Sequence, residues 1–342
     1  MEDPVEARAD DSTDLYDVTT WEPRTRLDRI AVRTYRGVLG AGRAMLILLG
    51  FLILTLILLG GLGAVFIDNP FVVGLVVLSV VPAGFLALYV YVADVTTREP
   101  PTLLAATFLL AILFAGFAAV INTAFAFLQI VPFVGFILFF YLVVGPVEEV
   151  VKLLAVWLYP YRSPRFDSVV DGAVYGAVAG LGFATIENAV YISGNLVTPA
   201  ETAAVTITEQ ISTAISAGGE ITAIRGLAGP GHVIYSAFAG YYLGLAKFNP
   251  DDAGPIVVKG LLIAAFIHAT YNTLVGIVPA LVSLAFPGIP ILVLFFGFVV
   301  VYQGFFGYIL YRKLKRYTVA YRQVHGGSDV AHDAERTEFD PR

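Results

Sequence analysis

Long apolar stretches, separated by short polar connections, dominate the chain from about residue 44 onward. Each stretch is close to the roughly 20 residues that an α-helix needs to cross about 30 Å of hydrocarbon. A membrane β-barrel would instead show alternating segments of about ten residues. The pattern therefore predicts an all-α, polytopic membrane protein with about eight transmembrane helices. The expected spans are residues 44–67, 71–93, 102–128, 133–158, 169–193, 229–247, 256–278 and 288–311.

The basic residues predict how these spans are oriented. Arginines cluster before the first span, and further lysines and arginines follow the second, fourth, sixth and eighth spans. The intervening connections carry mainly acidic residues, with Arg225 as their one strong base. Because cytoplasmic loops are enriched in lysine and arginine, this alternation predicts a multi-pass protein of the cell membrane with both termini in the cytoplasm.

The polar segments complete the predicted organisation. Residues 1–43 form a polar tail with a basic juxtamembrane segment, which is either a short helix on the membrane surface or a plain flank of the first span. Residues 44–312 form the transmembrane domain that would carry any catalysis. Residues 313–342 form a charged tail that we expect to be disordered. The connection 194–228 is expected on the outer side, either as a simple loop or as a partly helical cover.

Composition narrows the chemistry. The 342 residues are 58% hydrophobic and 14% charged, and none is cysteine. Disulfides, thiol nucleophiles and cysteine-rich zinc sites are therefore excluded. The formal net charge of −6 comes mainly from the tails and loops. We therefore expect the lipid bilayer as the surroundings of the protein and no nucleic acid as a partner.

One charged segment interrupts the apolar run of the fourth span, with Glu148, Glu149 and Lys152 inside five residues. A charged side chain at the centre of a membrane helix costs at least about 2.5–3.5 kcal/mol. These groups must therefore face protein or water and have partners. Lys152 lies at a helical spacing from which it can reach either carboxylate. A structural ion pair needs one carboxylate and leaves the other over, whereas ionisable groups inside a membrane usually mark a functional site.

Polar groups of the next three spans are expected to meet this segment. Glu187 lies in the fifth span, His232 opens the sixth, and His268 and Asn272 lie one turn apart in the seventh. With a rise of about 1.5 Å per residue, their depths are compatible with one polar cavity in the outer half of the membrane. Glycines at four-residue spacing should also let the fifth and sixth spans approach neighbouring helices closely. They are Gly172, Gly176 and Gly180 in the fifth span and Gly240 and Gly244 in the sixth.

Carboxylates and imidazoles around such a cavity suit the activation of water, and two mechanisms are open. In the first, Glu187, His232 and His268 bind a metal ion such as Zn²⁺, and a carboxylate of the fourth span is the general base. In the second, Glu148 deprotonates water without a metal, and His232 and Asn272 stabilise the oxyanion. The candidate catalytic residues are Glu148, Glu149, Glu187, His232, His268 and Asn272.

Two other classes of function use similar residues. Buried glutamates and histidines also form proton relays, so the first alternative is a proton-coupled membrane transporter. No clear inverted repeat of broken helices supports that alternative. The second is a membrane binding protein without catalytic activity, although the complete set of polar groups argues against a decayed enzyme.

Taken in order, the motifs resemble those of the PrsW family of intramembrane proteases, within the superfamily that includes CAAX prenyl proteases and bacteriocin-immunity proteins (CPBP). The chain carries Glu-Glu-x-x-Lys at 148–152, Phe-x-x-x-Glu at 183–187, Gly-His at 231–232 and His-Ala-Thr-Tyr-Asn at 268–272. Asp94 and the segment Arg98-Glu99-Pro100 also resemble the family's early Asp and Glu-Pro positions. The resemblance covers roughly residues 80–280.

The resemblance implies an intramembrane endopeptidase, usually classed as a metalloprotease, that cleaves membrane-anchored protein substrates. The family's namesake cleaves a membrane-anchored anti-sigma factor from the outer side, so the resemblance implies a regulatory substrate of that kind. The prenyl-protease relatives carry His where this chain has Glu187, and their mechanism is argued to use glutamate without a metal. The resemblance therefore leaves both mechanisms open.

Overall fold

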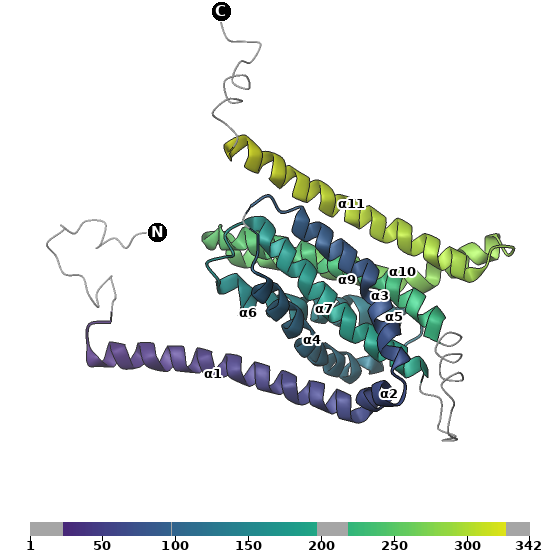
Figure 1. Cartoon of the computed structure of the whole chain (residues 1–342), viewed down its shortest axis with the longest axis horizontal. Coiled ribbons are helices and arrows are strands. Elements are labelled where there is room, and N and C mark those ends of the chain that lie inside the picture. Colours follow the sequence, from purple (N-terminus) through teal and green to yellow (C-terminus); the bar gives the residue numbers. More distant parts are fainter. Residues whose placement is uncertain (1–22, 97, 197–217, 326–342) are drawn as a thin grey trace, which may run out of the picture. The chain divides into compact units, whose positions relative to one another are not determined.

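A computed structural model describes residues 23–96, 98–196 and 218–325 (Figure 1). These residues form helices joined by short turns and contain no strand, so the all-α prediction is confirmed. The chain divides into two compact units, residues 1–51 and residues 52–342. The α-helices are α1 (Arg26–Ile57), α2 (Gly63–Asp68), α3 (Phe71–Val92), α4 (Pro101–Ala124), α5 (Val134–Phe139), α6 (Gly145–Leu158), α7 (Val169–Leu196), α9 (Gly218–Lys247), α10 (Ala253–Ala285) and α11 (Ile291–His325).

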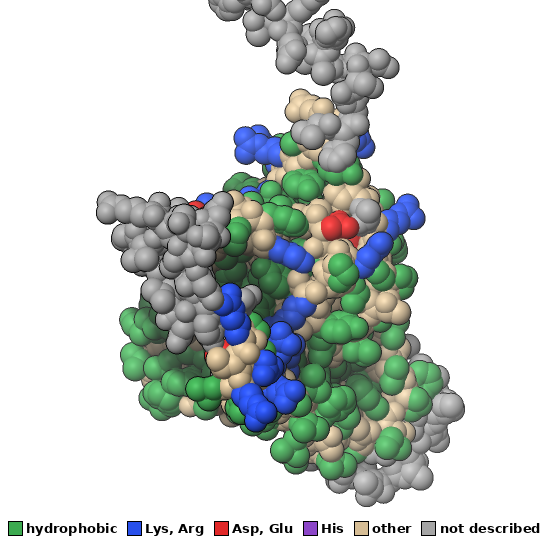
Figure 2. Space-filling model, turned by 90° about the vertical axis from the view of Figure 1, so that its left-hand side faces the viewer, with side chains coloured by type: hydrophobic (Ala, Val, Ile, Leu, Met, Phe, Trp, Pro, Cys, Tyr) green, Lys and Arg blue, Asp and Glu red, His purple; other side chains and the backbone are tan. Residues whose placement is uncertain are grey.

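The described residues contain 7 helical segments that are long and apolar enough to cross a membrane. They coincide with seven of the predicted spans, so the protein is a multi-pass membrane protein. The predicted sixth span lies in α9, whose His232, glycines and tyrosines lower its hydropathy. Large hydrophobic side chains are exposed to the surroundings, and hydrophobic side chains cover much of the face in Figure 2. Such a surface is suited to lipid.

Three segments are more helical than the sequence predicts. The predicted outer loop 194–228 is shorter, because α7 continues to Leu196 and α9 begins at Gly218. The helical piece expected near residues 200–216 lies outside the described residues. At the other end, α11 continues to His325, so the first part of the tail 313–342 is helical rather than disordered. The basic segment before the first span is likewise helical, because α1 begins at Arg26.

The packing of α7 against α9 forms the centre of the larger unit. A β-carbon added at Gly176 would lie 2.2 Å from the backbone oxygen of Ser236, and one at Gly240 would lie 2.0 Å from that of Gly172. Such distances leave no room for a side chain, so the glycines predicted as packing stripes on the two helices face each other. At the end of α9, Lys247 Nζ donates to the backbone oxygen of Phe166, 2.8 Å away, just before α7 begins.

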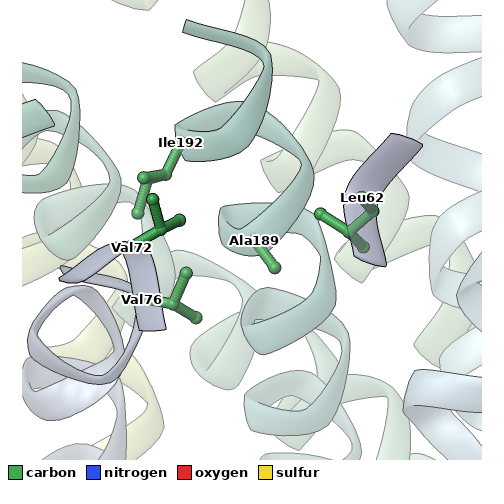
Figure 3. Packing of buried hydrophobic residues seen from close by; sticks show 5 residues of the cluster. All are labelled: Leu62, Val72, Val76, Ala189 and Ile192. Atoms are coloured by element: carbon green, nitrogen blue, oxygen red, sulfur yellow. The ribbon is translucent and has the colours of Figure 1, made fainter. Parts of the chain in front are cut away.

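Two apolar clusters hold the helix ends that carry the polar residues. The first packs the end of α7 against α3 and the π-helix Leu58–Leu62 (Figure 3). Its buried members are Leu62, Val72, Val76, Ala189 and Ile192. The second cluster, Phe139, Val143 and Val144, lies at the end of α5 and in the π-helix Phe140–Val144 just before α6, and it packs against Ile121 near the end of α4 and Val147 in α6. The polar side chains therefore project from helices whose ends are fixed by burial of apolar surface.

Candidate active site

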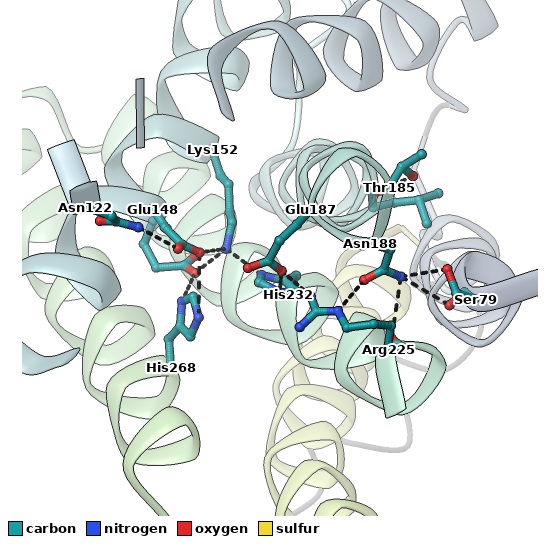
Figure 4. A network of polar contacts seen from close by, with 12 residues as sticks. Ser79, Asn122, Glu148, Lys152, Thr185, Glu187, Asn188, Arg225, His232 and His268 are labelled. Atoms are coloured by element: carbon teal, nitrogen blue, oxygen red, sulfur yellow. Dashed lines mark hydrogen bonds and ion pairs between the residues drawn. The ribbon is translucent and has the colours of Figure 1, made fainter. Parts of the chain in front are cut away.

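Four helices bring the predicted polar residues together (Figure 4). Glu148 lies in the first turn of α6, Glu187 in α7, His232 in α9 and His268 in α10. Glu149, next to Glu148, is fully buried, and the two histidines are also buried. The close approach of α6 to α10 depends on Gly145, where a β-carbon would lie 2.7 Å from the backbone oxygen of Ala265.

Lys152 balances the charge of Glu149. Its Nζ donates to Glu149 Oε1 at 2.7 Å and lies 3.9 Å from Glu148 Oε2. The same Glu149 oxygen accepts a hydrogen bond from His268 Nδ1 at 2.9 Å, and Oε2 accepts one from Ser236 Oγ at 3.2 Å. Both oxygens of Glu149 are thus hydrogen-bonded, as a buried carboxylate requires.

The hydrogen bonds of His232 define which of its nitrogens carries the proton. Lys152 Nζ lies 2.9 Å from His232 Nδ1, and because an ammonium group can only donate, Nδ1 accepts. His232 Nε2 then donates to Glu187 Oε2 at 2.8 Å. The guanidinium of Arg225 donates to the same Glu187 oxygen through Nη2 and to Asn188 Oδ1 through Nε at 2.9 Å.

A buried carboxylate oxygen and an imidazole nitrogen approach each other at the centre of the group. Glu148 Oε1 accepts from Asn122 Nδ2 at 3.1 Å, but the buried Oε2 has no hydrogen-bond partner among the described residues. His268 Nε2 lies 3.7 Å from this oxygen. Since His268 Nδ1 donates to Glu149, Nε2 carries a lone pair, so two acceptors face each other. A water molecule or a cation between them would satisfy both.

A cavity of about 650 Å³ opens beside these atoms, and Glu148, Glu187, Arg225, Asn272 and Tyr235 are among the residues that line it. Most of the remaining lining is apolar, from α4, α6, α7, α9 and α10. Such a cavity can admit water to the carboxylates, which hydrolysis inside a membrane requires. Asn272 reaches the cavity one turn after His268, as the sequence indicates.

The donor set of the site fits a metal ion. Glu148, His232 and His268 each offer one ligand atom, and these atoms all lie within 4.8 Å of one another. Two imidazoles with one carboxylate is a donor set of catalytic zinc sites, and the unpartnered Glu148 oxygen is consistent with a ligand position facing an ion. Glu187, the ligand proposed from the sequence, is not in this group and instead contacts Arg225 and His232.

Three residues beside the site were missed in the sequence. Arg225 was assigned to the outer loop, yet it lies two turns before His232 in α9 and therefore on the same face. Asn122 is an isolated amide in the apolar α4, and it bonds Glu148. The buried ring of Tyr235 stacks on His268, with ring centroids 5.2 Å apart. A helical spacing from His232 was the available signal for Arg225 and Tyr235.

Comparisons with known proteins relate most of the helical region to one family. The family model described as PrsW family intramembrane metalloprotease matches residues 99–303, more than half of the chain. The protease PrsW of Shouchella clausii is 27% identical over 200 residues, covering 58% of this chain and 82% of the relative. The proteases PrsW of Geobacillus kaustophilus and Bacillus subtilis are 32% and 29% identical, over 37% of this chain in each case and over 47% and 50% of their own lengths.

No solved structure matched the chain. The matched segment contains α4, α6, α7, α9 and α10, and hence all four helices that carry the acidic and histidine side chains. On the match to the family model and the relatives together, the chain belongs to the PrsW family of intramembrane metalloproteases.

Proposed function

We propose that the peptide-bond hydrolysis of this intramembrane endopeptidase takes place beside Glu148, at the wall of the cavity between α4, α6, α7, α9 and α10. The observation that carries the proposal is the convergence of Glu148, His232 and His268, with ligand atoms within 4.8 Å of one another. Family membership favours hydrolysis over proton-coupled transport or binding without catalysis. The relationship to the wider CPBP superfamily stays a prediction.

The residues that would hold a metal ion are Glu148, His232 and His268. A bound ion would supply Lewis-acid polarisation of the attacking water and of the scissile carbonyl. Two further carboxylates, which would not contact the ion, would orient the imidazoles: Glu187 contacts His232 Nε2, and Glu149 contacts His268 Nδ1. For His232 Nδ1 to face an ion, Lys152 must release this nitrogen while keeping its 2.7 Å bond to Glu149. Zn²⁺ is the first candidate for this ion, because two imidazoles and one carboxylate form a donor set of catalytic zinc sites.

The proton of the attacking water needs a carboxylate acceptor, and two glutamates line the cavity. If Glu148 binds an ion, the acceptor is Glu187, whose contacts with Arg225 and His232 both use Oε2. If no ion takes part, the acceptor is Glu148 through its unpartnered Oε2. In either version we assign to Asn272, which lines the same cavity, a hydrogen bond to the developing oxyanion.

The substrate is a protein within the membrane, and we propose that it is a membrane-anchored regulatory protein of the anti-sigma-factor kind. A helical substrate keeps its backbone groups in internal hydrogen bonds, so the segment to be cut must unwind before water can attack it. The apolar lining around the polar centre suits such a segment. Cleavage from the outer half of the membrane stays a prediction from the sequence.

Variants of the two cavity glutamates test the proposal. Purified protein would be reconstituted with a panel of quenched-fluorescent single-span peptides, and its metal content would be measured by elemental analysis. We expect Glu148→Gln to lose cleavage by at least about 10³-fold and to lose the ion, whereas Glu187→Gln loses cleavage and keeps the ion. Glu220→Gln, an exposed change at the start of α9, should keep both.

The opposite results are equally informative. If wild-type protein carries no ion and is insensitive to chelators, the mechanism is the metal-free one with Glu148 as the acceptor. If Glu148→Gln keeps both its ion and its activity, the assignment of this site to peptide-bond hydrolysis is wrong.

A further inference from the structure

A second acidic group lies far from the candidate active site. Asp94 follows α3, Glu99 precedes α4 and Asp171 lies in the first turn of α7, and one oxygen of each lies within 4.8 Å of the others. At a rise of about 1.5 Å per residue, Asp171 and Glu187 are about 24 Å apart along α7. We propose that Asp94, Glu99 and Asp171 bind a divalent hard cation, with Ca²⁺ as the best fit, independently of the active site.

The burial of Glu99 without hydrogen-bond partners indicates that a ligand binds here. Its side chain is 2% exposed, and neither Oε1 nor Oε2 has a hydrogen-bond partner among the described residues. Asp94 Oδ2 is buried without a partner as well. The hydroxyl of Tyr175, one turn after Asp171, is likewise buried and unpartnered, and Glu99 and Asp171 are the charged groups that act on it most strongly. Buried polar atoms rarely lack hydrogen-bond partners. Four such oxygens close together therefore indicate that a ligand of the folded protein is missing here.

The missing partner should be positively charged. No lysine or arginine forms an ion pair with these three acids in the part of the chain that the structure describes. Two cations lie nearby, but they donate to carbonyl oxygens instead: Arg165 Nη2 to Arg98 at 3.2 Å and Lys247 Nζ to Phe166 at 2.8 Å. Burial, followed by the fields of Asp94 and Asp171, raises the pKa of Glu99 to about 9. Because burial is the largest cause of this shift, a bound cation would compensate the desolvation of the Glu99 carboxylate as well as its repulsion from the two aspartates.

The rest of the cluster holds the acids in place. Asp171 Oδ2 accepts hydrogen bonds from the backbone N–H groups of Asp167 at 2.7 Å and Ser168 at 3.0 Å. Asp94 Oδ1 accepts from the backbone N–H of Thr96 at 2.8 Å and from its hydroxyl at 2.7 Å. Asp94 is therefore fixed through Oδ1 alone, whereas Asp171 is held through both oxygens, because the hydroxyls of Ser168 and Thr96 also donate to its Oδ1. Within the described ranges, Asp94 Oδ2 and the two oxygens of Glu99 remain without hydrogen-bond partners and can converge on an ion beside Asp171.

The chemistry and the spacing favour calcium. All the donors are oxygens, which Ca²⁺ and Mg²⁺ prefer, whereas the active site offers two imidazoles. Oxygens on opposite sides of Ca²⁺ are about 4.6–5.2 Å apart, against about 4.0–4.2 Å for Mg²⁺. One oxygen of each acid lies within 4.8 Å of the others, which is close enough for the three acids to reach one ion. Ca²⁺ also accepts an irregular set of oxygens, whereas Mg²⁺ requires near-ideal octahedral geometry.

A cation here would tie together the loop after α3, the start of α4 and the start of α7. Among the described residues, the side-chain hydrogen bonds that join these elements here are long: Thr96 Oγ1 lies 3.3 Å from Ser168 Oγ and 3.4 Å from Asp171 Oδ1, and Arg165 Nη2 lies 3.2 Å from the Arg98 carbonyl oxygen. Binding to the folded state alone stabilises a protein in proportion to the logarithm of ligand concentration. The proposal therefore predicts that calcium raises the melting temperature of the protein.

Calcium titration of the purified full chain, freed of bound ions with a chelator, tests this site. We expect calorimetry to show one Ca²⁺ per chain, with a melting temperature that rises with CaCl₂ concentration and less with MgCl₂. Glu99→Gln and Asp94→Asn should each weaken binding by at least about tenfold. Asp251→Asn, which removes an exposed acid elsewhere, and Glu148→Gln at the active site should both bind calcium as the wild type does.

Two results would overturn the proposal. One is the absence of calcium binding by wild-type protein, in which case the buried acids are held by shared protons. The other is calcium binding that persists at unchanged affinity in Glu99→Gln and Asp94→Asn, which would locate the ion elsewhere. If Glu99→Gln does not fold, Asp94→Asn still tests the proposal. Neither result changes the assignment of the hydrolytic site.

Discussion

Lys152 is buried completely, and its contacts make it the electrostatic centre of the candidate active site. Its ammonium group lies 2.7 Å from Glu149 Oε1 and 2.9 Å from His232 Nδ1, and it sits 4.4 Å from the centre of the Phe183 ring. Removing one partner of a buried ion pair leaves an uncompensated charge. The position is therefore one where a single substitution should have a large effect on stability.

We expect Lys152→Met to lower the free energy of unfolding by about 3–5 kcal/mol, because it leaves Glu149 charged and without its cation. Unfolding of the purified protein in mixed micelles, followed by circular dichroism, measures this. The double variant Lys152→Met with Glu149→Gln should recover most of the loss, since it removes both charges. A loss below about 1 kcal/mol in the single variant would show that the pair is screened by water.

For individual residues, the sequence predicted which acidic side chains form the site better than it predicted which side chains contact them. Charged groups inside apolar runs are costly, so Glu148 and Glu187 stand out in the hydropathy pattern alone. Arg225, which pairs with Glu187, does not stand out in this way. It lies near the end of a span, where basic residues are common. Which nitrogen of His232 meets Lys152 also depends on the side-by-side placement of α6 and α9, and no local pattern encodes that placement.

Among the helices, the contact of α7 with α9 depends on glycine. The backbone of α9 lies so close that a β-carbon at Gly180 would be 2.3 Å from the carbonyl oxygen of His232. The same contact thus sets the distance between Glu187 and His232, which lie on these two helices. The glycine spacing in the sequence indicated a close approach but did not say which helix would be approached.

Substitution of Gly176 tests this contact. We expect Gly176→Ala to destabilise the protein by about 1–3 kcal/mol, because the new methyl group would lie 2.2 Å from the Ser236 backbone oxygen and must push the helices apart. Gly194→Ala in the same helix meets nothing within 4 Å and is the matched control. Its effect should be neutral or stabilising by up to about 1 kcal/mol. Equal melting temperatures for the two variants would contradict the close packing.

Helix ends were harder to predict than helix centres. The apolar pattern stops where lipid contact stops, but a helix continues as long as its side chains find partners. In α11, Lys313 donates to Tyr242 Oη at 3.3 Å and lies 4.4 Å from the ring centre of Tyr241, so basic residues that resemble a tail belong to a packed helix. Arg225, near the start of α9, is likewise a basic residue that resembles part of a loop but belongs to a packed helix, because its Nε donates to Asn188 Oδ1.

For the whole molecule, the number of membrane crossings depends on α9. Among the described residues, length and composition together give 7 helices that could cross, which would be an odd count. However, α9 runs antiparallel to α7: Arg225 near its start meets Glu187 and Asn188, and Lys247 at its end meets the backbone just before α7. A helix that follows α7 over this length covers a similar depth. We therefore predict that the polar α9 also crosses the membrane, sheltered by its neighbours, which would make eight crossings.

The absence of cysteine makes the crossing count directly testable. Single cysteines at the exposed positions Pro164, Asp251 and Gly288 would be probed with a membrane-impermeant maleimide in intact cells. Because α7 and α9 together make a return crossing, Pro164→Cys and Asp251→Cys should both be protected until the membrane is permeabilised. Gly288→Cys, beyond α10, should react at once, since the basic loops are expected in the cytoplasm. Labelling of Pro164→Cys and Asp251→Cys from opposite sides would mean that α9 does not cross, and a full reversal of the pattern would invert the predicted orientation.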